Sequence, residues 1–477
     1  MPKRVAVIDL GSNSARMVIF ERTSRLGFFI FREYKIKVRL GEGAYENGGV
    51  LQQKAMDNVF CAFSEFKHLI KFYGVKKVLC AGTSALRDAP NAKDFIKRIF
   101  DELSLNLKVI DGKTEAFFGG IAALNLLSPI EQATTLDIGG GSAELAKIQN
   151  GKIIDTISLN LGTVRLKELF FDKNQPDLID KFINEYVLKI PDHFRSDNLI
   201  AIGGSLRAIS DSIITKTNHP IKTLHNFHYK FDEQKDFIRA IISSSLDNLQ
   251  NFYIKKDRFD TIRGGAAIFV AIADKLGTKS VFTSSAGVRE GVFLSNLLRP
   301  GINLPKNFNP SIRSLQDRFC QKNSQIALKF ANKLFKELSP LHKLNPNLAF
   351  ELGVASKIFN ATFSLNLEPK HGGYMIRNGI NYGFTHSQKA LISAIIEYGD
   401  KGEAGLANYG NLLPNIESVR WLNYILLLSQ FFGERAEMDF KFTQNRLEIY
   451  GAKDYFMLKD NIQKLSKPSE FEIVFSE

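Results

Sequence analysis

The chain carries one strand–turn–strand pattern twice, and this repeat constrains its fold more than any other feature. In the first copy, residues 5–20, two apolar runs flank a polar Gly-Ser-Asn-Ser turn. In the second copy, residues 134–146, the turn reads Gly-Gly-Gly-Ser. Apolar runs rich in β-branched residues and separated by Gly, Ser and Asn are typical of β-hairpins.

The two copies correspond position by position through the turn. The matched pairs are Asp9 with Asp137, Gly11 with Gly139, and Ser14 with Ser142. A single Gly-rich turn is a common structural feature that merely closes a hairpin. Two turns in one register predict two similar lobes, each offering an anion-binding nest of backbone amides to a shared cleft.

Composition and charge narrow the class of ligand. The net charge of +13 and the pI near 9.4 favour a polyanionic partner, with a solvated basic surface as the alternative. The sequence has no zinc-finger spacing, basic tail or aromatic RNA-binding signature, so we expect a small or linear phosphate ligand and no duplex nucleic acid. Three widely spaced cysteines, no signal-peptide core and no membrane-spanning run predict a cytoplasmic protein without a membrane partner.

The order of strand and helix patterns predicts four domains. Strands alternate with helices up to about residue 300, which is typical of an α/β architecture. A Pro-rich linker at 300–310 precedes helical patterns, and a strand–helix–strand pattern ends the chain. The expected domains are two lobes at 1–128 and 129–302, a helical domain at 303–440 and a small α+β cap at 441–477.

Six motifs occur in the order of one known family. They are 9–14 (Asp-Leu-Gly-Ser-Asn-Ser), 83–87 (Thr-Ser-Ala-Leu-Arg), 111–116 (Asp-Gly through Glu-Ala), 137–144 (Asp-Ile-Gly-Gly-Gly-Ser-Ala-Glu), 203–204 (Gly-Gly) and 287–291 (Gly-Val-Arg-Glu-Gly). The chain thus resembles the exopolyphosphatase and guanosine pentaphosphate phosphohydrolase family, within the superfamily of actin, sugar kinases and heat-shock chaperones. The resemblance is strong over residues 1 to about 300 and looser beyond.

This resemblance implies an α/β fold of two actin-like (ribonuclease H-like) lobes around an interlobe cleft. It also implies an α-helical domain resembling the His-Asp phosphohydrolase fold, followed by the small C-terminal cap. The helix expected at 348–363 lacks the His-Asp pair that binds metal in some relatives. We therefore expect a metal-free helical domain that binds or guides substrate.

Phosphate contacts are assigned from the two turns and from arginines near strand ends. Gly11, Ser12, Asn13 and Ser14 are expected to hold one phosphate, and Gly139, Gly140, Gly141 and Ser142 its neighbour. Arg16, Arg87 and Arg263 are further phosphate-binding candidates, and Arg289 is a similar one; a structural ion pair is the alternative for the strand-end arginines. Gly203 and Gly204 either contact a nucleoside or allow close packing.

The resemblance also implies a metal ion and a general base. Mg²⁺ (or Mn²⁺) prefers oxygen ligands, and Asp137, Glu144 and Asp9 are the expected carboxylates. Glu115, at the start of a helix, is the expected base that deprotonates the attacking water. Its structural alternative is charge compensation at the helix N-terminus.

The implied activity is metal-dependent hydrolysis of terminal phosphoanhydride bonds by a homodimer. The substrate is inorganic polyphosphate, guanosine pentaphosphate, which is converted to the tetraphosphate, or both. A non-hydrolytic alarmone or polyphosphate sensor and an actin-superfamily phosphotransferase are the alternatives. No guanine-reading motif is legible, so the sequence does not rank the two substrates.

Overall fold

The computed structural model describes residues 3–320, 324–361, 369–433, 437–452 and 454–476. The chain divides into two compact units, Met1–Phe308 and Asn309–Glu477. The finer division of each unit, with boundaries after residues 128, 302 and 440, stays a prediction.

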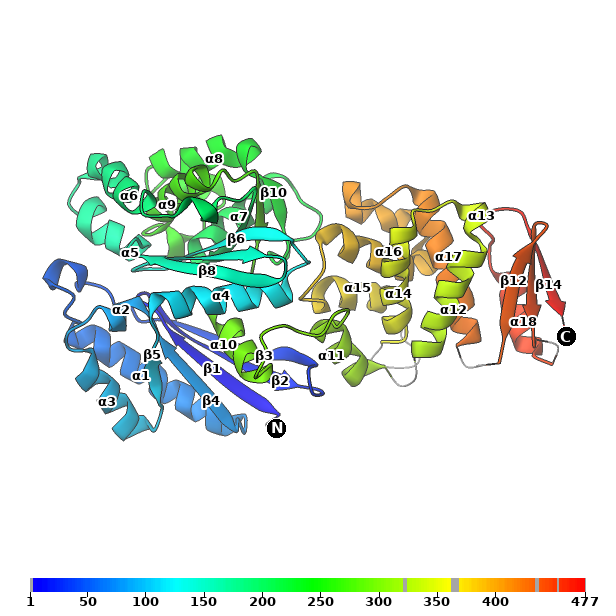
Figure 1. The fold of residues 1–477 in the computed structure, drawn as a ribbon, viewed down its shortest axis with the longest axis horizontal. Helices are drawn as coiled ribbons and strands as arrows, with labels where there is room; N and C mark the ends of the chain where they lie inside the picture. The colour runs from blue at the N-terminus through cyan, green and yellow to red at the C-terminus, as the bar shows by residue number, and fades with distance from the viewer. Residues whose placement is uncertain (1–2, 321–323, 362–368, 434–436, 453, 477) are drawn as a thin grey trace. The chain divides into compact units, whose positions relative to one another are not determined.

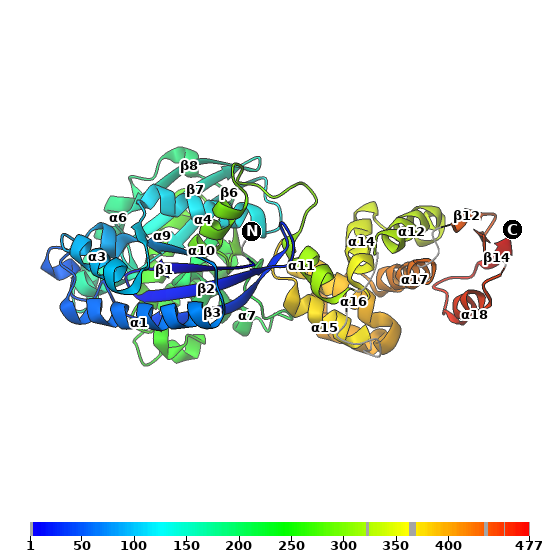
Figure 2. The ribbon, with the colours of Figure 1, turned by 90° about the horizontal axis from the view of Figure 1, so that it is seen from below.

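The first unit contains two sheets, and the first sheet spans the N-terminal part. Its strands follow the order β3-β2-β1-β4-β5. The bounds are β1 Arg4–Leu10, β2 Ser14–Arg22, β3 Phe28–Lys37, β4 Lys77–Gly82 and β5 Leu107–Val109. The helices between them are α1 Gln53–Phe72, α2 Ser84–Arg87 and α3 Ala92–Leu103, and α1 runs along the strands in Figure 2.

The second sheet repeats this strand order with one addition. Its order, β8-β7-β6-β9-β11-β10, matches the first sheet over five strands and adds β10 at the edge. The strands are β6 Gln132–Ile138, β7 Ala143–Gln149, β8 Lys152–Leu159, β9 Asn198–Gly203, β10 His228–Lys230 and β11 Ser280–Thr283. The helices are α5 Thr163–Leu166, α6 Ile179–Val187, α7 Gly204–Lys216, α8 Phe231–Ser243, α9 Ile262–Leu276 and α10 Val288–Leu297.

Backbone register confirms that the two hairpins are equivalent. Asp9 lies directly opposite Arg16 in the first hairpin, and Asp137 lies opposite Glu144 in the second. The same turn hydrogen bond closes both: the Gly11 amide donates to the Ser14 carbonyl at 3.1 Å, and the Gly139 amide to the Ser142 carbonyl at 2.9 Å. The predicted repeat is therefore present in the fold.

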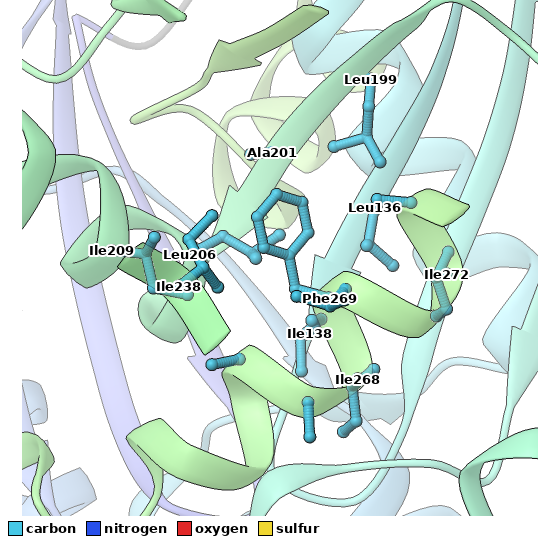
Figure 3. Packing of buried hydrophobic residues seen from close by; sticks show 14 of the residues in the cluster. Leu136, Ile138, Leu199, Ala201, Leu206, Ile209, Ile238, Ile268, Phe269 and Ile272 are labelled. Carbon is cyan, nitrogen blue, oxygen red and sulfur yellow. The ribbon is translucent and has the colours of Figure 1, made fainter. Parts of the chain in front are cut away.

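Apolar strands buried on both faces anchor each turn in a rigid core. Residues 5–8 of β1 and 133–136 of β6 are buried without interruption, because helices cover these central strands. Around β6, side chains from α7 and α9 meet β9 in one cluster, with Phe269 among Leu136, Ile138 and Leu199 (Figure 3). A rigid strand that ends in a polar turn holds that turn in a fixed position.

Helix α4, Gly112–Leu126, lies between the two sheets (Figure 1). It packs against β7 and β8 of the second lobe and against α10, which in turn contacts β1 of the first. A Cβ added at Gly291 in α10 would overlap the Phe118 carbonyl of α4, so only glycine permits this crossing. The N-terminus of α4 carries Glu115 into the space between the lobes.

The second unit begins with helices. These are α11 Pro310–Phe319, α12 Ser324–Glu337, α13 Ser339–His342, α14 Ala349–Ile358, α15 Pro369–Gly379, α16 His386–Lys401 and α17 Ile416–Phe432. The helical pattern of residues 311–338 predicts one continuous helix, and this prediction is wrong, because Cys320 is extended and ends α11. The helix expected at 348–363 ends at Ile358, and residues 362–363 lie outside the described residues.

The unit ends in a sheet of three strands with one helix. The order is β12-β13-β14, with β13 antiparallel to β12 and parallel to β14. The elements are β12 Asp439–Thr443, β13 Arg446–Tyr450, α18 Phe456–Lys464 and β14 Glu472–Ser476. Among the described residues of the whole chain, no helix combines the length and apolarity that crossing a bilayer requires. Likeness of the helices to the His-Asp phosphohydrolase fold stays a prediction.

Candidate active site

An open cleft lies between the two lobes of the first unit, with both turns on its walls. The predicted site residues that line it are Asp9, Gly11, Ser12, Asn13, Ser14, Arg16, Glu115, Asp137, Gly139, Gly140, Ser142, Gly203 and Gly204. Four other predicted residues, Arg87, Gly141, Glu144 and Arg263, are outside this lining. The structure thus brings most of the predicted set to one surface.

The two turns are in direct contact at the cleft floor. A Cβ added at Gly140 would lie 2.9 Å from the Ser12 Cβ, and one at Gly141 would overlap the Ser84 and Tyr45 hydroxyls. The Ser12 hydroxyl also lies 3.1 Å from the Ser84 hydroxyl. Glycines at 140 and 141 are therefore required because the second turn packs against the first.

Arg87 connects Glu115 to the second turn. Its Nη1 lies 3.2 Å from Glu115 Oε2, and its Nη2 lies 4.0 Å from Glu144 Oε1 and 3.5 Å from the Ser142 hydroxyl. Glu144 Oε1 accepts a further hydrogen bond from Ser158 at 2.8 Å. Predicted from separate motifs, these side chains form one buried network at the side of the cleft.

Burial shapes the protonation of this network. Burial raises the pKa of Glu115 well above its usual value, the charge of Glu144 raises it further, and Arg87 opposes both. Burial also raises the pKa of Glu144 to about 7, although the Ser142 hydroxyl lowers it. A carboxyl whose pKa is raised toward neutrality is suited to accept a proton from water.

Asp9 and Asp137 form the acidic part of the cleft. Both line the cleft and are partly exposed there, and removal of most surrounding water raises the pKa of Asp137 to about 6 against the opposing charge of Arg207. Burial likewise raises the pKa of Asp9, which Arg289 and Arg16 oppose. A Cβ added at Gly203 would lie 2.5 Å from Asp137 Oδ1, and a Cβ added at Gly287 would lie 3.8 Å from Asp137 Oδ2. Asp137 therefore lies beside the N-termini of α7 and α10.

Buried arginines crowd the same part of the cleft. The pKa of Arg16 falls to about 10 because the side chain is buried and because Arg289 and Arg207 repel its charge. Arg207 donates to the Gly203 and Ser285 carbonyls at 2.9 and 2.8 Å, and Arg289 pairs with Glu33 at 2.6 Å. These arginines converge and repel one another, so a ligand with several negative charges would relieve the repulsion and bind well here.

The sequence interpretation missed part of this positive lining. Arg207, Lys35, Lys37 and Arg258 line the cleft and were not assigned to it. The alternation of Lys35 and Lys37 along β3, which puts both on one face, is the one signal that marks them in advance. Arg258 packs over Gly204, where a Cβ would lie 2.5 Å from its Nη1.

Arg263 lies apart from the other predicted phosphate contacts. Its guanidinium stacks over the Phe171 ring at 4.7 Å, and its Nη1 donates to the Ser244 carbonyl at 3.4 Å. The structure thus gives Arg263 partners within the second lobe and does not bring it to the cleft lining.

The carboxylates of the cleft are few for a metal site made of protein ligands alone. Among the residues described, no three Asp, Glu, His or Cys side chains gather closely enough to hold a metal ion. Mg²⁺, however, usually takes one or two carboxylates and completes its octahedron with waters and substrate phosphates. Two carboxylates that line the cleft, Asp9 and Asp137, fit that mode.

Comparisons with known proteins agree with this geometry. The model of the Ppx/GppA phosphatase family matches residues 18–300, more than half of the chain. A structure titled as the Ppx/Gppa enzyme of Aquifex aeolicus is 26% identical with a TM-score of 0.51, covering 62% of this chain and 100% of that one. A second structure, titled as the Aquifex aeolicus member of the Ppx/GppA family, is 24% identical with a TM-score of 0.54, covering 63% of this chain and 99% of that one.

An exopolyphosphatase structure from Cytophaga hutchinsonii is 21% identical with a TM-score of 0.57, covering 63% of this chain and 100% of that one. At this identity the likeness shows the fold, which is the two-lobed architecture described above. The family match begins after the first turn and spans the stretch that contains the second turn, Glu115 and Asp137. The chain belongs to the Ppx/GppA phosphatase family, within the actin-like superfamily.

Proposed function

We propose that this phosphatase hydrolyses terminal phosphoanhydride bonds and releases orthophosphate, with Mg²⁺ required for turnover. Inorganic polyphosphate and guanosine pentaphosphate are the proposed substrates. The observation that carries the proposal is the convergence of two phosphate-type turns and a buried carboxyl, Glu115, on one cleft. A similar fold in a protein titled exopolyphosphatase supports the choice of polyphosphate.

The proposed role of the two turns is to hold neighbouring phosphates at the end of the chain. Phosphate oxygens repel an approaching nucleophile, so a catalyst must neutralise their charge and hold the reacting groups in line. Backbone amides and hydroxyls at 11–14 and 139–142 provide donors from two sides. Arg16, Arg207 and Arg289 provide charge for the oxygens further from the reacting bond.

Glu115 is the proposed general base. It accepts the proton of a water that attacks the terminal phosphorus. The bond from that phosphorus to the bridging oxygen breaks, the shortened chain leaves with the oxygen and its electron pair, and the terminal phosphorus is released as orthophosphate. Arg87 keeps the Glu115 carboxyl oriented through the 3.2 Å contact. The charge of Arg87 also lowers the pKa of Glu115 and so favours the ionised carboxylate. Mg²⁺ held by Asp137, with Asp9 or Glu144, would supply charge neutralisation at the phosphate oxygens when bound.

Phosphate release separates this proposal from its alternatives. Purified protein is incubated with polyphosphate or with guanosine pentaphosphate, with Mg²⁺ or with EDTA, and orthophosphate is measured. We expect release with Mg²⁺ and loss of most of it in EDTA. A protein that binds either ligand without any release is a sensor. Substrate consumption that requires an acceptor alcohol or carboxylate, and that yields the phosphorylated acceptor in place of orthophosphate, identifies a phosphotransferase.

A further inference from the structure

Tyr45 lies behind the cleft, between the two turns. It begins the short 3-10 helix Tyr45–Asn47, and its hydroxyl lies 3.1 Å from the Ser12 hydroxyl of the first turn. The same hydroxyl occupies the space where a Cβ of Gly141 in the second turn would lie. Tyr45 is thus in contact with both turns, and its side chain acts as a spacer between them.

Arg165, in α5, ties the second turn to this spacer. Its Nε donates to the Gly141 carbonyl at 3.1 Å, and its guanidinium lies 4.4 Å from the centre of the Tyr45 ring. Its Nη2 pairs with Asp88 at 3.0 Å. Asp88 follows Arg87 directly, and its amide donates to the Ser84 carbonyl, so the same guanidinium also fixes the segment that carries Arg87.

The contacts join the two lobes. Tyr45 and Asp88 belong to the first lobe, whereas Gly141 and Arg165 belong to the second. A parallel contact holds the loop that carries Tyr45, since Glu168 Oε1 accepts from the Gly43 amide at 2.9 Å. Neither Tyr45 nor Arg165 is among the residues that line the cleft, so neither is placed to touch a ligand there.

We propose that Tyr45 and Arg165 are positioning residues that set the separation of the two turns to that of neighbouring phosphates in one chain. Consecutive phosphates have a fixed spacing, so one ligand bonds both turns well only if the turns are held at that spacing. Displacements of about 1 Å at a reacting centre cost about a hundredfold in rate. A single orthophosphate occupies one turn and is insensitive to the separation.

The test compares a ligand that spans both turns with one that does not. Affinities for inorganic tripolyphosphate and for orthophosphate are measured by calorimetry on the full chain, for wild type, Arg165→Ala, Arg165→Lys and Tyr45→Phe. We expect Arg165→Ala to lose about tenfold or more of the tripolyphosphate affinity and to keep orthophosphate affinity within about twofold. Arg165→Lys retains a cation over the Tyr45 ring and recovers part of the loss.

Turnover adds a second readout that rests on the proposed function. With polyphosphate, we expect kcat to fall by a larger factor than KM rises in Arg165→Ala. The reason is that the substitution displaces the terminal phosphate from its reacting position more than it weakens substrate binding. Tyr45→Phe loses only the hydroxyl contact with Ser12 and gives a smaller change in the same direction. If Arg165→Ala fails to fold, as its thermal unfolding midpoint would report, Tyr45→Phe replaces it in the test.

Lys173→Ala is the matched control. Lys173 pairs with Glu46 at 3.7 Å across the same two lobes, but both side chains are about half exposed and touch neither turn. We expect wild-type affinities from it. Unchanged tripolyphosphate affinity in both Arg165→Ala and Tyr45→Phe, or an equal loss for orthophosphate, overturns the inference. A wild-type protein that binds tripolyphosphate but releases no phosphate refutes the proposed function alone, and the binding comparison still decides the positioning role.

Discussion

Arg87 places one guanidinium between two carboxyl groups that have different proposed roles. It pairs with Glu115 at 3.2 Å and lies 4.0 Å from Glu144. Only one of these carboxyls, Glu115, is at the start of a helix that reaches the cleft, where Asp111 caps the helix by accepting from the Thr114 amide at 2.8 Å. The proposed base is therefore fixed by its helix and by an ion pair.

Glu115→Gln tests the base directly. The amide keeps the shape of the side chain and cannot accept the proton of water, so we expect turnover to fall by about a hundredfold or more while substrate affinity changes little. Orthophosphate release and tripolyphosphate calorimetry measure the two effects. Glu131→Gln, on the exposed surface, is the control and should match wild type. Near-normal turnover of Glu115→Gln removes this residue from the role of base.

The pH dependence follows from the charges around Glu115. The base must be ionised, and its pKa is raised by burial and by Glu144, so activity declines on acidification at a pH above the usual range of glutamate. Arg87 lowers this pKa; Arg87→Met therefore moves the acid limb of the pH–kcat profile to still higher pH. Exposed Arg25→Met leaves the limb unchanged. An acid limb that stays in place or moves to lower pH in Arg87→Met contradicts the assignment.

Sequence patterns predicted the residues of the site best where the backbone itself makes the site. The turns at 11–14 and 139–142 were found because a duplicated hairpin carries its own register. Arg207, Lys35 and Lys37 were missed because only packing of distant elements turns their side chains to one cleft. Arg263 was assigned to phosphate by its place in a similar turn-like segment, but its guanidinium stacks on the Phe171 ring away from the cleft lining.

At the scale of elements, the crossing of α4 with α10 controls where Glu115 lies. These helices approach so closely that Gly291 faces the Phe118 carbonyl, and backbone atoms on both sides leave no flexible group to move away. Apolar periodicity predicts helices at 52–73 and 91–103, and α1 and α3 match these bounds within one residue at each end. The sequence pattern predicts no strand at 228–230 or 439–443, where β10 and β12 lie, because pairing to neighbouring strands decides such short elements.

Gly291→Ala tests this crossing. The added methyl group forces α10 and α4 apart, so we expect a loss of about 1–3 kcal/mol in the free energy of unfolding, together with lower kcat because Glu115 moves. Urea unfolding followed by circular dichroism and phosphate release measure both. Gly119→Ala, in the partner helix α4, is the control, since its Cβ would lie at an ordinary 3.6 Å from Ile202. Equal effects of the two substitutions contradict the argument.

At the scale of the molecule, unfolding of the second unit can be followed separately from that of the first. Trp421 is the only tryptophan in the sequence, and it is buried in α17 of the second unit. Its fluorescence therefore follows unfolding of that unit. Dimer formation, the cytoplasmic location and the role of the helical unit toward substrate stay predictions.

Lys389, in α16, is the clearest stability cost in the second unit. Only 1% of its surface is exposed, and burial lowers its pKa from 10.5 to about 8. Between pH 8 and pH 10.5, Lys389 is protonated in the unfolded chain and largely neutral in the folded protein. The folded state is therefore penalised fully below pH 8, by about 3 kcal/mol, and the penalty disappears as pH rises toward 10.5.

Lys389→Met removes this penalty with little change of volume. We expect the variant to be more stable than wild type at pH 7, in urea unfolding followed by Trp421 fluorescence, and the difference to shrink steadily toward pH 10. Lys336→Met, on the exposed surface of α12, should show no such dependence. A stability difference that is absent at pH 7, or constant with pH, contradicts the assigned cause.

The proposed mechanism requires that two equivalent hairpin turns hold successive phosphates of one ligand. A crystal structure of the protein soaked with tripolyphosphate tests this requirement. We expect consecutive phosphate groups within hydrogen-bond distance of residues 11–14 and of 139–142, with the terminal phosphorus facing Glu115. Phosphate density that contacts one turn only, or that lies outside the interlobe cleft, would contradict it.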